Sequence, residues 1–172
     1  GDSLITFCTD IHEYAGDGTF TIGNVADAPS SPGGINGMGE TKAAMLEHLY
    51  ANHYDSVKFS SASFDAAAAF QIVIWEVVNE TLTNGFSLTG GKFRAKNMEA
   101  STKALADSWL ADIFAHYTPG SGQFSGDAFG ALRGAILNGG QDQLVVVPLP
   151  APVMLGGVGL LGLAILRKRR KA

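Results

Sequence analysis

The sequence predicts an α+β fold in which short strands surround one central helix. Between Ala66 and Val78 the chain is apolar all round a helical projection except at Gln71 and Glu76, which is typical of a helix in the middle of a domain. At 172 residues, 46% of them hydrophobic, the chain can build one domain with a proper core but hardly two. We therefore expect a small sheet or barrel of short strands packed with this helix and two further helices, and a separate hydrophobic helix at the C-terminus.

The central helix is expected over residues 63–80. Asp65 favours the positive end of the helix dipole, and Asn84-Gly85 is a plausible stop. On this helix Gln71 would carry its carboxamide into the apolar interior, where an unpaired amide costs about 1–3 kcal/mol. The amide therefore needs a partner, which is either ordinary backbone or a specific group elsewhere in the chain.

The remaining elements are shorter. Apolar residues at helical spacing predict two more helices, over residues 40–54 and 96–116. Strands are expected near residues 4–9, 19–22, 57–60, 86–94 and 144–147. The segment 86–94 reads as a hairpin about its two glycines. Residues 28–39 predict a surface loop, and the glycine-rich segment 119–140 predicts at most a helical turn near 129–132.

Charge is divided unevenly along the chain. Five of the twelve basic residues form the run Arg167–Lys171, so residues 1–166 hold seven basic and sixteen acidic residues, a formal charge of −9. An acidic body argues against nucleic acid as the partner. The chain begins at Gly1 without a methionine, so we expect a processed product from which any signal peptide has been removed.

No metal site or cofactor is expected from the histidines. His12, His48, His53 and His116 show no metal-ligand spacing. His48 and His53, at i and i+5, do not share a helix face well.

The C-terminal tail is a segment distinct from the folded domain. From Val145 to Leu166 the chain carries no charge, and the basic run follows at once, as in a membrane anchor with a positive-inside stop. Prolines at 148, 150 and 152 leave 14 residues, Val153–Leu166, for a helix. About 20 are needed to cross a typical bilayer. The four glycines in this segment suit a helix–helix contact or a recognition surface better than a permanent span, and an ordinary anchor is the alternative.

The order of features in this tail resembles a known sorting signal. Val147, Pro148, Leu149, Pro150 and Ala151, then an apolar helix, then RKRRK are similar to the VPLPA variant of the PEP-CTERM signals of Gram-negative bacteria. The resemblance implies a domain at residues 1–147 and a sorting signal at 148–172. It implies an exosortase partner, transient anchoring in the inner membrane, and a secreted protein at the cell surface or in the extracellular matrix.

Two further motifs carry chemistry. FCTD at residues 7–10 and FQIVIW at residues 70–75 resemble the two signatures of bacterial surface thioester domains. The resemblance implies an internal thioester between Cys8 and Gln71. Phe7, Phe70 and Trp75 would help to exclude water, and Asp10 would either polarise the site or serve as a turn or capping residue.

The physical logic agrees with this resemblance. Cys8 is the single cysteine, so it can form no intrachain disulfide. A thiolate is both a good nucleophile and a good leaving group, so a thioester between Cys8 and Gln71 would hold an acyl group ready for attack. An amine of a surface protein or a hydroxyl of a polysaccharide would displace Cys8 and become joined to Gln71. Such a chain reacts once per molecule and is not a turnover enzyme.

Two alternatives stay open. One is a structural, exopolysaccharide-associated surface protein that keeps the fold and has no thioester, since two motifs do not guarantee bonding distance. The weaker one is a cysteine hydrolase or transferase in which His12 or His48 serves as base for Cys8.

Overall fold

The computed structural model describes residues 4–30, 36–58, 63–83 and 85–148, and within them the fold is α+β. The helices are α1 (Glu40–His53), α2 (Phe64–Asn79) and α3 (Ala100–Ala115), with short 3₁₀ turns η1 (Val25–Asp27) and η2 (Tyr54–Ser56). One antiparallel sheet contains, in spatial order, β1 (Thr6–Cys8), β6 (Gln143–Val146), β5 (Leu132–Ile136) and β2 (Thr21–Gly23). A two-stranded ribbon, β3 (Tyr117–Thr118) and β4 (Gln123–Phe124), follows α3.

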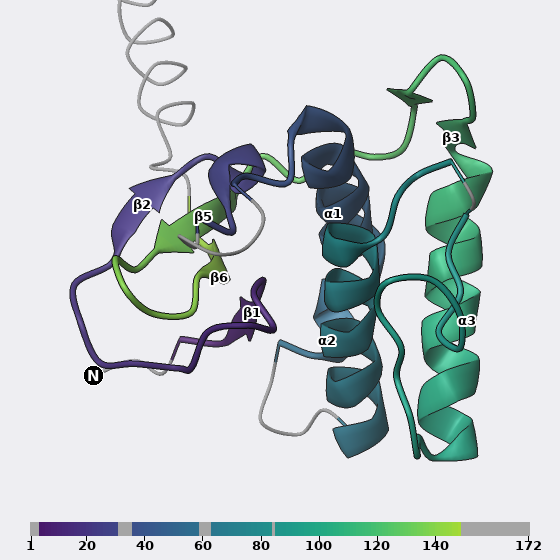
Figure 1. The fold of residues 1–172 in the computed structure, drawn as a ribbon, viewed down its shortest axis with the longest axis horizontal. Helices are drawn as coiled ribbons and strands as arrows, with labels where there is room; N and C mark the ends of the chain where they lie inside the picture. Colours follow the sequence, from purple (N-terminus) through teal and green to yellow (C-terminus); the bar gives the residue numbers. More distant parts are fainter. Residues whose placement is uncertain (1–3, 31–35, 59–62, 84, 149–172) are drawn as a thin grey trace, which may run out of the picture.

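Helix α2 lies in the middle of the molecule, as predicted. In Figure 1, α1 and α2 lie between the sheet on one side and α3 on the other. Helix α2 contacts β1, α1 and α3. The core side of α2 consists of Ala66, Ala69, Phe70, Val73, Ile74, Val77 and Val78, all with 7% exposure or less. Gln71, by contrast, is only half-buried, so the expectation that its carboxamide enters the apolar interior is corrected. Its side of the helix faces the edge of the sheet.

The first turn of α2 is fastened by side chains. Ser63 Oγ accepts a hydrogen bond from the Ala66 N–H at 3.1 Å, which satisfies one of the free donors of the helix end. The Asp65 carboxylate accepts hydrogen bonds from Ser101 Oγ at 2.7 Å and Thr102 Oγ1 at 3.0 Å. The start of α2 is thereby joined to the start of α3.

Strand β5 lies in the glycine-rich segment 119–140, where the sequence predicts at most a helical turn near 129–132 and no strand. Residues 129–132 form a turn in which the Leu132 N–H donates to Phe129 O at 2.9 Å, and β5 begins there. A Cβ on Gly134 would lie 2.7 Å from Asn24 O, so only glycine lets the segment before η1 cross β5 this closely. The glycine that weakens the strand pattern in sequence is therefore required by the packing.

The hairpin predicted at residues 86–94 is also wrong. Three backbone donors of this segment bind the carboxylates of Glu76 in α2 and Glu80 at its C-cap instead of a neighbouring strand. Glu76 Oε1 accepts the Ser87 N–H at 2.6 Å, and Glu80 Oε1 accepts the N–H groups of Lys92 and Phe93. A Cβ on Gly91, whose φ is 76°, would lie 2.3 Å from the Glu80 carboxylate. The loop thus wraps the C-terminal end of α2.

The other predicted boundaries are close to those observed. Helix α3 starts at Ala100 instead of residue 96, because Asn97 has a left-handed φ of 56°. Residues 57–58 are not a strand, and residues 59–60 lie outside the described part of the chain. The predicted surface loop at 28–39 contributes Ala28 and Met38 to the core.

No helix among the described residues is long and apolar enough to span a bilayer, and the helix expected from Val153 lies outside them.

Glu76 is fully buried, with 0% exposure, and its Oε2 has no hydrogen-bond partner among the described residues. Burial raises the pKa of this carboxyl from 4.5 to about 7, although the hydrogen bond from Ser87 opposes the shift. Between about pH 4.5 and 7 the native state therefore keeps a proton that the unfolded chain has released.

We expect this proton to make stability depend on pH. Because the native state binds it more tightly, the contribution to the free energy of unfolding is fully present below about pH 4.5 and is lost as the pH rises through about 7. The change is about 3 kcal/mol. Urea unfolding measured between pH 4.5 and 7 should show that the free energy of unfolding falls more steeply with pH for wild type than for Glu76→Gln. Glu99→Gln, at an exposed position, should behave as wild type; equal slopes for all three proteins would refute the assignment.

Candidate functional site

Strand β1 places Cys8 at the edge of the sheet. It pairs only with β6 among the strands of the described residues, with Cys8 opposite Gln143 and Phe7 opposite Leu144. Successive residues of a strand face opposite sides. Phe7 enters the core, at 6% exposure, whereas Cys8 is half-buried on the other side.

The carboxamide of Gln71 binds the free edge of β1 at Cys8. Gln71 Oε1 accepts a hydrogen bond from the Cys8 N–H at 2.9 Å, and Gln71 Nε2 donates to Cys8 O at 2.8 Å. These backbone groups point away from β6, and the side-chain amide satisfies them as a neighbouring strand would. The two residues are 63 positions apart, so the structure brings together the pair that the sequence analysis selected.

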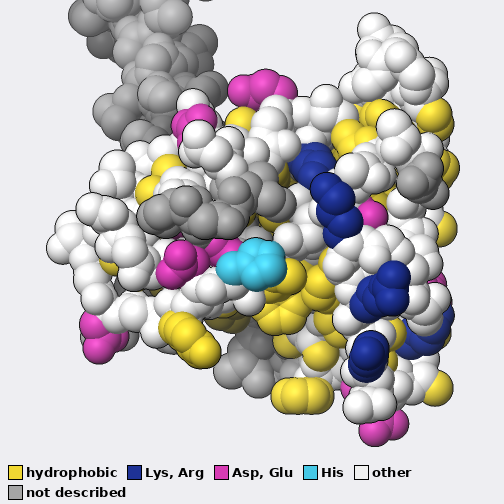
Figure 2. Space-filling model, in the orientation of Figure 1, with side chains coloured by type: hydrophobic (Ala, Val, Ile, Leu, Met, Phe, Trp, Pro, Cys, Tyr) yellow, Lys and Arg dark blue, Asp and Glu magenta, His cyan; other side chains and the backbone are white. Residues whose placement is uncertain are grey.

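Aromatic side chains flank this contact on the core side. The rings of Phe7 and Phe70 lie 4.7 Å apart, and Phe70 is fully buried. Trp75 is half-buried, and its ring lies 6.2 Å from that of Phe93. Figure 2 shows hydrophobic side chains at the surface where β1 and α2 of Figure 1 meet. Phe7 and Phe70 are therefore placed to limit water from the core side, and Trp75 lies one helical turn beyond Gln71.

The thiol of Cys8 is protonated at neutral pH, because burial raises its pKa above the ordinary value. No hydrogen bond of the described residues joins Cys8 to His12 or His48. The arrangement contains a thiol, a carboxamide and a backbone N–H directed at the amide oxygen. A thiol, an amide carbonyl and an N–H donor at its oxygen are among the groups that acyl transfer uses.

Asp10 takes the turn role that the sequence allows. Its Oδ1 accepts the His12 N–H at 2.7 Å, the pattern of an Asx turn, while its buried Oδ2 has no partner within the described ranges. Gln141 Nε2 donates to Asp10 O. Asp10 thus shapes the chain directly after Cys8.

Asp142 is a positioning residue that the sequence analysis misses. Its backbone oxygen accepts the Thr9 N–H at 2.9 Å. Its carboxylate accepts the N–H of Leu137 at 2.7 Å and that of Ser30 at 2.6 Å. An aspartate in a Gly-rich turn gives no signal of this in sequence, because two of its partners, Thr9 and Ser30, come from distant segments.

A second polar cluster lies away from Cys8. His48 of α1 lies beside Asp112 of α3 and His116, the residue directly after α3, and their nitrogen and oxygen ligand atoms lie within 4.8 Å of one another. His53 Nε2 also lies 3.4 Å from Asp112 Oδ2. The packing of α1 against α3 thus brings together histidines that show no metal-ligand spacing in the sequence.

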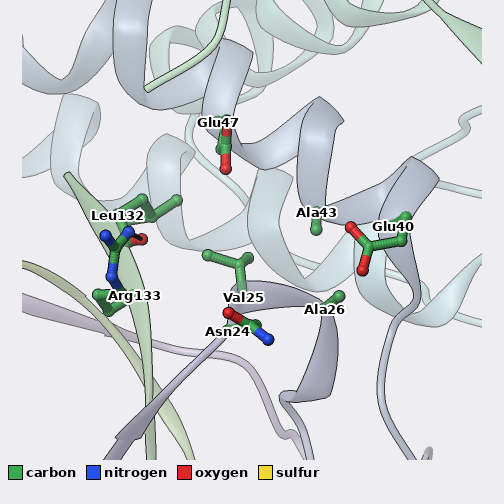
Figure 3. A pocket seen from close by; sticks show the side chains of 8 residues that line it. All are labelled: Asn24, Val25, Ala26, Glu40, Ala43, Glu47, Leu132 and Arg133. Carbon is green, nitrogen blue, oxygen red and sulfur yellow. Dashed lines mark hydrogen bonds between the residues drawn. The ribbon is translucent and has the colours of Figure 1, made fainter. Parts of the chain in front are cut away.

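A pocket of about 210 Å³ opens between α1, η1 and β5. Figure 3 shows Glu40 and Glu47 of α1 facing it, with Arg133 of β5 on the opposite wall. Neither Cys8 nor Gln71 lines it. It presents charged walls of both signs and no nucleophile beside a base.

The sorting motif is described only at its start. Val147 is 37% exposed and its N–H donates to Ala131 O at 2.9 Å, and Pro148 follows at the surface. Leu149, Pro150 and Ala151 lie outside the described residues, as does the rest of the tail.

No family model, curated protein or solved structure matches this chain.

We expect Asp142→Asn to destabilise the fold by about 1–3 kcal/mol, because an amide cannot accept both backbone N–H groups that the carboxylate accepts. The measurement is the urea midpoint at constant slope. Asp17→Asn, at an exposed position, is the matched control and should leave the midpoint unchanged. Equal midpoints for the two variants would show that the carboxylate does not hold this junction.

Proposed function

We propose that this chain is a secreted cell-surface or matrix protein that attaches covalently to a partner through an internal thioester between Cys8 and Gln71. The observation that carries the proposal is the pair of hydrogen bonds, 2.9 and 2.8 Å, between the Gln71 carboxamide and the Cys8 backbone. They hold the amide carbon against the residue that bears the thiol. Adhesion or biofilm matrix assembly is the role that this chemistry suits.

The contact suits the formation of the bond. Cys8 Sγ attacks the Gln71 amide carbon, the C–S bond forms, the C–N bond breaks, and ammonia leaves with the thiol proton. The Cys8 N–H already donates to Oε1, where negative charge develops in the tetrahedral intermediate. The thiol proton that Cys8 loses on attack is the proton that the departing nitrogen takes up.

The second half of the reaction uses the stored acyl group. An amine or hydroxyl of the partner attacks the thioester carbonyl, forms an amide or ester with Gln71, and releases the Cys8 thiol. The half-buried position of both residues lets a partner reach the bond from one side. The chain is consumed in this step, so it acts as an anchor and not as a turnover enzyme.

A structural role without the thioester is the second candidate. The same two hydrogen bonds satisfy the carboxamide and the exposed edge of β1, which by itself is a sufficient reason for glutamine at this position. In that case the protein would be a structural component of the surface or of an exopolysaccharide matrix.

The thioester reading predicts an intact mass lower by one ammonia than that of the unmodified chain, when the protein is purified without nucleophilic buffers. Methylamine should then add to Gln71 and release one titratable thiol. Mass spectrometry of the intact protein and of its peptides measures both. Full mass together with a free thiol in wild type would exclude the thioester and leave the structural role.

Two variants test the pair separately. Cys8→Ala keeps the backbone groups that bind Gln71, so it should fold as wild type and incorporate no methylamine. Gln71→Glu has no ammonia to lose and leaves Cys8 O without its donor, so it should also be inert and less stable by about 1–3 kcal/mol. A pull-down of the covalent adduct would identify the partner nucleophile.

For the tail we propose processing by an exosortase-type sorting enzyme of a Gram-negative cell, after transient anchoring in the inner membrane. Mature protein from the surface should lack the residues beyond 148–152, and a strain without the sorting enzyme should accumulate the longer form in the inner membrane. C-terminal peptide mapping distinguishes the forms. Retention of Arg167–Lys171 on most surface protein would indicate an ordinary anchor instead.

A further inference from the structure

We propose that His48, Asp112 and His116 bind one divalent transition-metal ion of the zinc type, which would tie α1 to α3. His48 comes from α1, Asp112 from the last turn of α3, and His116 is the residue directly after α3. His48 has a side-chain exposure of 3% and Asp112 of 41%. The cluster is therefore buried on the α1 side and open to solvent on the other.

The spacing of the ligand atoms suits such an ion. His48 Nε2 lies 3.2 Å from Asp112 Oδ2, and a ring nitrogen of His116 completes a set within 4.8 Å. Tetrahedral bonds of 2.0–2.2 Å place ligand atoms about 3.4 Å apart. Two imidazoles and one carboxylate with an exposed side leave a fourth position for water. Hard cations such as Mg²⁺ prefer an all-oxygen set, so this site selects against them.

A second set of groups lies behind His48. Its Nδ1 accepts the Asp127 N–H at 2.9 Å, and Asp127 Oδ2 lies 3.7 Å from the same nitrogen. Asn52 Nδ2 donates to Asp127 Oδ2 at 3.1 Å and so holds the carboxylate.

Without an ion, the hydrogen bond from Asp127 implies that the His48 proton sits on Nε2 and is donated to Asp112. When a metal takes the Nε2 lone pair, the ring carries its proton on Nδ1. The Asp127 N–H and Asn52 Nδ2, which point at Nδ1 without the ion, then have to turn away, and the Asp127 carboxylate, 3.7 Å from this nitrogen, is the acceptor at hand. A carboxylate behind a ligating histidine is the usual outer partner of a metal site. Asp127 is thus a positioning residue for the ion.

The test uses the full chain with the Cys8→Ala substitution, so that no thiol competes for the metal. After chelator treatment, titration with zinc chloride should show one site by calorimetry and raise the unfolding temperature, while magnesium chloride should do neither. His116→Ala and the near-isosteric Asp112→Asn should each lose this binding. His12→Ala removes an exposed histidine outside the cluster and should bind as the parent does.

Asp127→Asn should bind about 10–100-fold more weakly while keeping one site. Absence of zinc binding by the folded parent, or binding by both His116→Ala and Asp112→Asn with unchanged affinity, would overturn the proposal and leave His48 and Asp112 as a hydrogen-bonded pair between helices. The outcome is independent of the thioester, because Cys8 is replaced throughout.

Discussion

Burial of α2 between the sheet and α3 is the constraint on which the rest of this structure depends. An apolar helix gains stability only if neighbours cover it, and here its few polar side chains also fasten those neighbours. Asp65 binds the start of α3, Gln71 binds the edge of β1, and Glu76 and Glu80 bind the loop that wraps the helix end. Each of these contacts joins segments that are distant in sequence.

The same atoms of Gln71 and Cys8 that hold the edge of β1 would also take part in the proposed reaction. A glutamine that mimics a neighbouring strand protects an edge, and it also places an amide carbon beside a thiol-bearing residue. The N–H that holds the amide oxygen in the resting protein is the donor that would stabilise the intermediate. The supports of this site, Asp10 and Asp142, act on the backbone around Cys8 and not on the thiol.

The helices could be predicted from sequence because their signals are local. Helical spacing and long apolar runs located α1 and α2 within one or two residues. The strands were harder to predict from the sequence. Strand β5 contains Gly134, which weakens its strand pattern, and it is a strand because it pairs with β6 on one side and β2 on the other. The segment 86–94 has the composition of a hairpin, yet its donors are taken by Glu76 and Glu80, a competition that no local pattern reveals.

By itself the sequence determined the α+β class and the central helix, which follow from periodicity acting over a few positions. The choice of Cys8 and Gln71 as a pair came from the resemblance of two short motifs to a known family. Only the tertiary structure decided that Gln71 is half-buried and bonded to the Cys8 backbone, that Glu76 is buried with one oxygen unpaired, and that three of the polar residues of α1 and α3 converge. The physical reason is that burial and hydrogen-bond partners depend on which distant segments pack together, and that packing is a property of the whole fold.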